Sequence, residues 1–343
     1  MKKLLHKLRK RNDLPPSSRI TSETVAEHRE HILAGGRRFK YPIQYARHKL
    51  VINTIIISMA ALVVVLAVGW WQLYKVQNTS EFMYHVTEVI PVPVANIDGQ
   101  PVLYSDYLMK YLSSAHYIEQ KEQVNLKTDD GKRQIEYIKQ QSMQDAIADA
   151  YALKLSKNLG VSVSDSELEG FLKAQRQSSD GEISEQTYNA VILDYYGWSP
   201  VEYRYVTNVK LLRQKVAYAM DKGALNAASS AASALKNNST TDFKTLTTTI
   251  SSQTGTKATY GVSGWVPKTN QDGGLATEAA KLKKLQVSSI IKSALGDGYY
   301  IVRLLDINDT KVSYEYIQIP LTAFTKALDG VINSGKVQKY ISV

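Results

Sequence analysis

The amino-acid sequence predicts a single membrane-spanning helix, followed by an all-α module and then a small α+β module. The helix is indicated by an apolar run without any charged residue, VINTIIISMAALVVVLAVGWWQLY, at residues 51–74. At a rise of 1.5 Å per residue, 24 residues extend roughly 36 Å and can cross a hydrocarbon core of about 30 Å. The two modules are indicated because helical spacing of apolar residues dominates the middle of the chain, whereas alternating strand patterns gather near its end.

The charge of the chain is concentrated before the apolar run. The first 49 residues hold 13 Lys and Arg against 4 Asp and Glu, and the remainder holds 29 against 28. The net charge of +10 therefore does not indicate a nucleic-acid-binding protein. By the positive-inside rule, the basic segment places the N-terminus in the cytoplasm of a bacterial cell and the chain beyond about residue 75 outside it.

The far end of the apolar run carries Trp70, Trp71 and Tyr74, which is typical of a membrane–water interface. A cleaved signal peptide is the alternative interpretation. It is disfavoured because the basic region and the apolar core are long and no Ala-x-Ala site follows. We therefore expect a single-pass protein of the bacterial cytoplasmic membrane. For the basic tail, contact with anionic lipid is the simple interpretation, and docking on the translocon or the ribosome is the alternative.

The sequence offers no recognisable metal or cofactor site. Its lack of cysteine excludes disulfides, thiolate nucleophiles and cysteine-based zinc sites. His28 and His31 are spaced as a metal pair could be, but no third ligand is evident. The stretch 129–131, Asp-Asp-Gly, resembles a fragment of a calcium loop without the later ligands, which favours a turn with a helix cap. We expect no cofactor and no nucleic-acid partner.

The first exported elements are short. Two strands are expected around the turn at Asp98 and Gly99, followed by a helix from Ser105. Further helices are expected at 131–159, 164–175, 185–196 and 200–220. Their starts and stops are marked by capping residues such as Ser164, with Glu167 three residues later, and by Gly160 and Gly197.

The composition changes after Met220 towards Ala, Ser, Thr and Asn. Short helices are expected at 224–236, 242–252, 277–285 and 322–333. Alternating runs in GDGYYIVRLLDIND and KVSYEYIQIP predict two strands, and GVSGWVPK predicts a glycine-broken one. The expected division is therefore a basic cytoplasmic tail (1–49), a transmembrane helix (50–74), a linker (75–91), a helical module (92–220), an α+β module (221–310) and a C-terminal strand and helix (311–343).

Two segments resemble known families. VANIDGQPVLYSDYLMKYL, DAIADAYALKLSKNLGVSVSDSELEGFL and YRYVTNVKLLRQKV together resemble the helical module of SurA/PrsA/PpiD-type chaperones over roughly 92–220. Residues 221–310 are similar to a parvulin-type peptidyl-prolyl isomerase domain, through Asp242-Phe243, GVSGW at 261–265 and GYYIV at 298–302. The resemblance implies an extracytoplasmic foldase that binds unfolded or nascent exported polypeptides.

The parvulin resemblance has a gap at its catalytic residues. Such domains carry two histidines facing the substrate proline, but no histidine follows His116 in this chain. Tyr300 stands at the histidine position of the last strand, and the expected first strand is missing before residue 225. SYEYIQI at 313–319 is its nearest likeness and places Tyr316 at the other histidine position. We therefore hypothesise that this C-terminal strand fills the central slot of the sheet.

The candidate isomerase pocket consists of Tyr300, Trp265 and Tyr316. An X-Pro bond must cross a barrier of about 18–20 kcal/mol, which an apolar pocket with well-placed donors can lower. Tyrosine hydroxyls can donate hydrogen bonds but cannot cycle a proton near neutral pH as histidine can. We therefore expect a catalytically degenerate domain. An active isomerase is the alternative.

Tyrosine is unusually frequent, with 22 Tyr against 5 Phe. Tyr104, Tyr107, Tyr111 and Tyr117 follow the predicted hairpin on one helix and are candidates for client binding, because tyrosine offers amphipathic contact area at low entropy cost. Placement in the core is an equally weighted interpretation. For the whole protein, an envelope scaffold with one dedicated partner and no chaperone activity is a further alternative.

Overall fold

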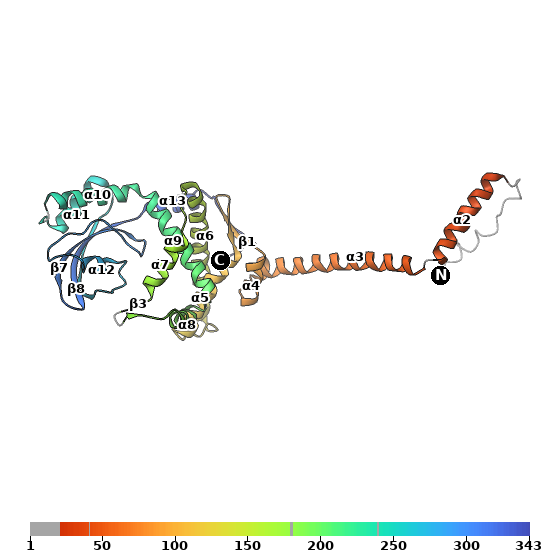
Figure 1. The fold of residues 1–343 in the computed structure, drawn as a ribbon, viewed down its shortest axis with the longest axis horizontal. Coiled ribbons are helices and arrows are strands. Elements are labelled where there is room, and N and C mark those ends of the chain that lie inside the picture. The colour runs from red at the N-terminus through yellow and green to blue at the C-terminus, as the bar shows by residue number, and fades with distance from the viewer. Residues whose placement is uncertain (1–20, 41, 179–180, 239) are drawn as a thin grey trace. The chain divides into compact units, whose positions relative to one another are not determined.

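The computed structural model describes residues 21–40, 42–178, 181–238 and 240–343 (Figure 1). The chain forms two compact units, with the boundary between Gln72 and Leu73. The first contains α2 (Ser22–Lys40) and α3 (Pro42–Trp71). Of the basic tail expected at 1–49, residues 1–20 and 41 lie outside the described part of the chain.

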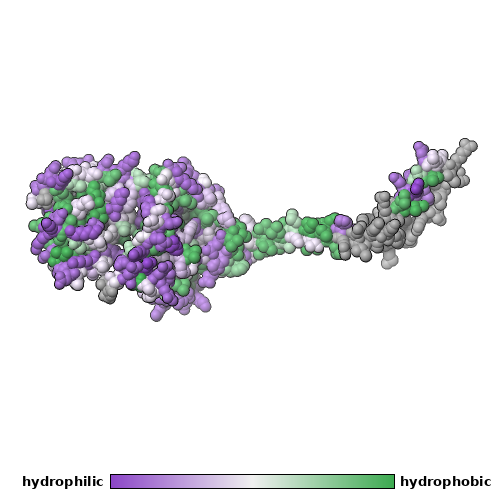
Figure 2. All heavy atoms as spheres, in the orientation of Figure 1, coloured by the Kyte–Doolittle hydropathy of each residue, from purple (hydrophilic) through white to green (hydrophobic). Residues whose placement is uncertain are grey.

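Helix α3 presents apolar side chains to its surroundings, as the green surface along it in Figure 2 shows. Among the described residues, one segment is long and apolar enough to cross a membrane, from His48 to Val76, and none of its most apolar stretch is buried. A soluble protein of this size would bury such a helix. The segment is consistent with a single-pass anchor near the N-terminus.

The second unit begins with a mostly helical part. Its elements, in chain order, are η2 (Gln72–Val76, a π-helical turn), α4 (Glu81–Val89), β1 (Pro93–Ile97), β2 (Gln100–Leu103), α5 (Tyr104–Gln120), α6 (Asp129–Leu159), α7 (Asp165–Gln175), β3 (Gln177–Ser178), β4 (Gly181–Glu182), α8 (Glu185–Tyr196) and α9 (Pro200–Met220). Ser164 and Ser199 each form a full capping box at the start of a helix. Gly160 and Gly197 end helices in the left-handed conformation.

The remaining elements form a small α+β part, except for α13 and β9, which pack on the helical part. They are α10 (Lys222–Asn237), α11 (Phe243–Thr254), β5 (Thr259–Pro267), α12 (Leu275–Ala279), β6 (Ile291–Lys292), β7 (Gly298–Ile307), β8 (Lys311–Pro320), α13 (Ala323–Asn333) and β9 (Val337–Lys339). The predicted fold class, an apolar helix with a helical module and a small α+β module, is confirmed.

The α+β part is built on a four-stranded antiparallel sheet of order β5-β8-β7-β6. Strand β8 is central and pairs with β7 through Ile301 opposite Ile317 and Val302 opposite Tyr316. The segment 313–319 therefore lies beside 298–306. One face of the sheet packs on α10 and α11, and the other packs on α12.

The C-terminal segment expected at 311–343 contacts both the α+β part and the helical part. While β8 belongs to the four-stranded sheet, β9 pairs with β1 and completes a second sheet of order β2-β1-β9. Helix α13 packs on α9, and Phe324 and Ile341 are buried in the core of the helical part. The helical module is therefore closed by the end of the chain.

Two local expectations need correction. The segment 75–91, expected to be a linker, contains α4 and contributes Met83, Tyr84 and Thr87 to the buried interior. The helix expected at 277–285 is the short α12, which ends at Ala279. The chain leaves the helix because the Leu285 N–H donates to the carbonyl of Leu304, so that this segment runs beside β7 instead.

Candidate functional site

Three tyrosines gather on the α12 side of the sheet. Tyr300 on β7 and Tyr314 and Tyr316 on β8 form a cluster that we call the tyrosine face. The rings of Tyr300 and Tyr316 are 5.8 Å apart, and those of Tyr314 and Tyr316 are 6.2 Å apart. The Tyr316 ring lies against Gly261 of β5, and a Cβ at that position would force the ring to shift.

Two hydroxyls of the tyrosine face are bound within the protein. The Tyr300 hydroxyl donates to Asp297 Oδ2 at 2.6 Å, and the Tyr314 hydroxyl donates to Asp272 Oδ2 at 2.5 Å. Burial first, and then the neighbouring carboxylates, raise the pKa of Tyr300 and of Tyr314 well above the usual value for tyrosine. Both hydroxyls are therefore neutral near pH 7 and cannot exchange protons with a substrate as histidine does.

Small residues of α12 lie opposite this cluster. Ala276 and Ala279 are fully buried against the sheet together with Leu275, in the same core as the tyrosine face. Short side chains on the helix leave room for the large rings on the strands. The tyrosines thus occupy volume that bulky helix residues would fill.

Trp265 does not join Tyr300 and Tyr316. The register between β5 and β8 shifts between Val262 and Trp265, and Trp265 then lies opposite Ser313. Ser313 precedes Tyr314 on β8, and adjacent residues of a strand point to opposite faces of the sheet. Trp265, which shares the face of Ser313, therefore lies on the face away from the tyrosines. Its side chain is 50% exposed. The three-residue pocket expected from sequence therefore does not form, because a β-bulge reverses the alternation.

The sequence predicts Tyr300 as a site residue but not its neighbours Tyr314, Asp272 and Asp297. The alternation in SYEYIQI places Tyr314 on the same face as Tyr316, so a register argument could have found it. Asp297 lies three residues before Tyr300, so its hydrogen bond is local. Asp272 lies 42 residues before Tyr314, and only the folded chain brings it to that hydroxyl.

The four tyrosines proposed for client binding are mostly internal. Tyr104, Tyr107 and Tyr111 are buried, and the Tyr104 hydroxyl donates to the Leu73 carbonyl at 2.8 Å. These three pack edge-on or stacked in sequence along α5, which is what the core interpretation predicts. Tyr117 is half-buried. Of the four, Tyr117 alone keeps a partly accessible ring.

An apolar groove opens elsewhere in the helical part, between β2, α5, α6 and α9. It encloses about 410 Å³ and is called the helical groove below. Its apolar lining includes Leu103, Met109, Leu153, Val206, Val209 and Leu212. The sequence indicates the α9 part of this lining as an apolar stripe, but periodicity does not tell whether another element covers it.

Polar groups line one side of the helical groove. Asp106 accepts a hydrogen bond from the Tyr205 hydroxyl at 2.7 Å, and Lys110 forms an ion pair with Asp149 at 2.6 Å. Burial raises the pKa of Asp106 even though Tyr205 and Lys110 favour its charged form. The groove thus combines apolar walls with a few fixed donors and acceptors, as ligand-binding sites commonly do.

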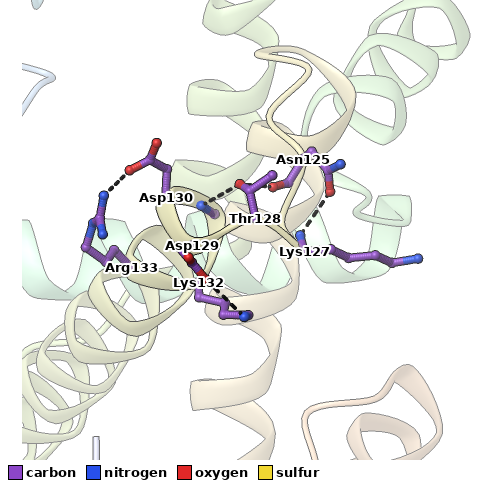
Figure 3. A network of polar contacts seen from close by, with 8 residues as sticks. Asn125, Lys127, Thr128, Asp129, Asp130, Lys132 and Arg133 are labelled. Atoms are coloured by element: carbon purple, nitrogen blue, oxygen red, sulfur yellow. Dashed lines mark hydrogen bonds and ion pairs between the residues drawn. The ribbon is translucent and has the colours of Figure 1, made fainter.

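The calcium-like stretch is a helix cap (Figure 3). Thr128 Oγ1 accepts the Gly131 N–H at 3.1 Å at the start of α6. Asp129 pairs with Lys132 at 3.2 Å, and Asp130 pairs with Arg133. Within the described ranges, no group of three or more His, Asp or Glu side chains is placed to hold a metal ion.

Comparison with protein families agrees with this architecture. The model of the SurA-like N-terminal domain matches residues 43–217, and the model of the PPIC-type PPIASE domain matches residues 211–306. The chain therefore belongs to the SurA-like N-terminal domain family, and it is a SurA/PrsA/PpiD-type chaperone with a parvulin-like domain. No curated protein matches the chain. The second match ends before β8 begins at Lys311, so the central strand of the sheet lies outside it.

Proposed function

We propose that this protein is a membrane-anchored chaperone that binds unfolded exported polypeptides outside the cytoplasm, and that its parvulin-like domain has lost catalysis. The tyrosine face carries the second part of the proposal. The Tyr300 and Tyr314 hydroxyls donate hydrogen bonds to Asp297 and Asp272, and both hydroxyls are neutral at physiological pH. No histidine follows His116, so this domain has no side chain that exchanges a proton readily near pH 7.

The anchor is the apolar segment from His48 to Val76. The excess of Lys and Arg before it supports a cytoplasmic N-terminus, which leaves the globular unit after it on the outer side of the membrane. The basic tail would then lie where exported chains enter the translocon, which makes the translocon a candidate partner.

The helical groove is the proposed client site. Its apolar walls can bury side chains of an unfolded segment, each contributing about 1.5–3 kcal/mol when fully buried. The polar edge formed by Asp106, Tyr205 and Lys110 can hydrogen-bond the backbone of an extended segment. Because the apolar contacts are not shape-specific, many sequences would bind weakly. Tyr117 is retained as a secondary contact.

Two substitutions of the same residue type on α9 test this site. Val209 lines the groove, whereas Val201 is 76% exposed and does not line it. Val209→Asp should impair suppression of aggregation of several unrelated denatured clients by the full chain in nanodiscs. Val201→Asp should leave suppression unchanged, and circular dichroism should show both variants folded. Equal activity of the two variants would contradict the groove as client site. Failure of the unmodified protein with every client would favour a scaffold with one dedicated partner.

An active prolyl isomerase is the second candidate, because the match to the PPIC-type domain extends over 211–306. Catalysis would then rest on desolvation of the prolyl amide and on hydrogen bonds from tyrosine. On the tyrosine face, the Tyr300 and Tyr314 hydroxyls bind carboxylates, and no such bond is seen for Tyr316 in the described structure. Tyr316 is therefore the residue to substitute if turnover is observed.

A further inference from the structure

Helix α4 has an apolar stripe that the protein does not cover. Phe82 is 69% exposed, Val89 82% and the adjoining Ile90 51%. With the half-buried Val86 they are spaced i, i+4, i+7 and i+8, which places them on one side of the helix. We call these four residues the α4 stripe. Exposed apolar surface arranged in this way marks an interaction site more often than scattered single residues do.

The rest of α4 is accounted for. Met83, Tyr84 and Thr87 are buried and fix the helix to the core of the helical part. Glu88 pairs with His85 at 2.8 Å on a third side of the helix, next to the stripe. The helix thus has a buried side, a polar side and an apolar exposed side. Packing against its own module does not require the third.

The position of α4 along the chain indicates what covers the stripe. Leu73 and Tyr74 belong to the end of the apolar segment His48–Val76 and also to the globular unit. The Leu73 carbonyl accepts from the Tyr104 hydroxyl at 2.8 Å, and the Tyr74 hydroxyl donates to the Pro93 carbonyl at 2.6 Å. The first residues of the globular unit are therefore also the last residues of the apolar segment, and α4 follows them directly along the chain.

The stripe lies close to the end of the apolar segment. Phe82 is six positions after Val76, and an extended chain covers at most about 3.3–3.6 Å per residue, so Phe82 is within roughly 20 Å of the end of the segment. Helix α4 also lacks lysine and arginine. Its contact with a bilayer would therefore depend on apolar burial rather than on attraction to anionic lipid.

We propose that the α4 stripe lies in the interfacial layer of the bilayer, with Phe82 and Val89 entering the boundary between headgroups and acyl chains. The proposal rests on the membrane anchoring proposed above. An apolar helix face of this kind enters the boundary by roughly 5–10 Å.

The absence of cysteine makes a direct test simple. Single variants Leu62→Cys, Phe82→Cys and Val262→Cys place a nitroxide in the apolar segment, on the α4 stripe and on exposed β5. Val262 is 51% exposed and serves as the aqueous reference. Each full-length variant is reconstituted into phosphatidylcholine vesicles. Power saturation then compares collisions of the label with oxygen, which concentrates in lipid, and with a water-soluble nickel chelate.

We expect the labels at positions 62 and 82 to favour oxygen and the label at 262 to favour the nickel chelate. A label at 62 in lipid with a label at 82 in water would overturn the α4 proposal and leave the anchor intact. Dipolar broadening at position 82 without lipid exposure would show that a second copy of the chain covers the stripe, and would also overturn it. A label at 62 in water would refute the anchor itself, and the α4 proposal with it.

Discussion

The central position of β8 can be tested by truncating one side chain on it. Ile317 is fully buried, lies opposite Ile301 of β7 and packs in the core between the sheet, α10 and α11. Ile317→Ala removes apolar contacts and leaves a cavity that neighbouring side chains only partly refill. Such substitutions cost about 2–5 kcal/mol.

Hydrogen exchange measured by mass spectrometry reports this loss locally. A loss of about 2 kcal/mol in the stability of the sheet should speed exchange of β7 and β8 amides roughly 30-fold, provided that they exchange by opening of the sheet. The matched control is Ile332→Ala on α13, where the same side chain is 45% exposed. We expect this control to change stability by less than about 0.5 kcal/mol.

The reasoning would be refuted if Ile317→Ala left exchange in β7 unchanged, or changed it no more than Ile332→Ala. Either result would mean that the segment after residue 310 is not part of the sheet core. Faster exchange in β7 and β8 but not in α6 would in addition show that the α+β part opens separately from the helical part.

Three further changes have defined outcomes. Tyr314→Phe removes the donor to Asp272 and should lower the free energy of unfolding by about 1–3 kcal/mol in urea titrations, while leaving client binding unchanged. Glu167 has its pKa lowered to about 2, first by the hydrogen bond from Lys215 and then by Ser164 at the cap of α7. Its stabilisation is complete above the unfolded pKa of roughly 4.3 and is lost as pH falls through about 2. In thermal melts, Glu167→Gln should therefore have a lower melting temperature than the unmodified protein. This difference should be constant from pH 7 to about 5 and should shrink below about pH 5. Asp221→Ala leaves three backbone N–H groups at the starts of α10 and α13 without their acceptor, and should cost at least about 2 kcal/mol in the same urea titrations.

Local signals predicted much of the helical part from sequence. The capping box at Ser164 and the glycines after α6 and α8 mark helix ends by interactions within a few residues, which is why those boundaries agree with the structure. The turn at Asp98 and Gly99 is equally local and connects β1 to β2.

The candidate sites depended on features that are not local. Register with β8 and a bulge in β5 decide that Trp265 faces away from Tyr300, and neither is visible in a single strand pattern. Tyr104 and Tyr107 are buried in a core that also contains Leu73 from before the helix and Phe324 and Ile341 from the end of the chain. A helix pattern cannot distinguish such a covered face from an open one.

The most direct test of the account is NMR exchange spectroscopy on unfolded proline-containing peptides mixed with the full chain in nanodiscs. We expect broadening of peptide resonances without cross-peaks between cis and trans prolyl forms, because the protein binds clients and its parvulin-like domain lacks turnover. Cross-peaks that depend on the protein would contradict catalytic degeneracy and would make the tyrosine face an active site.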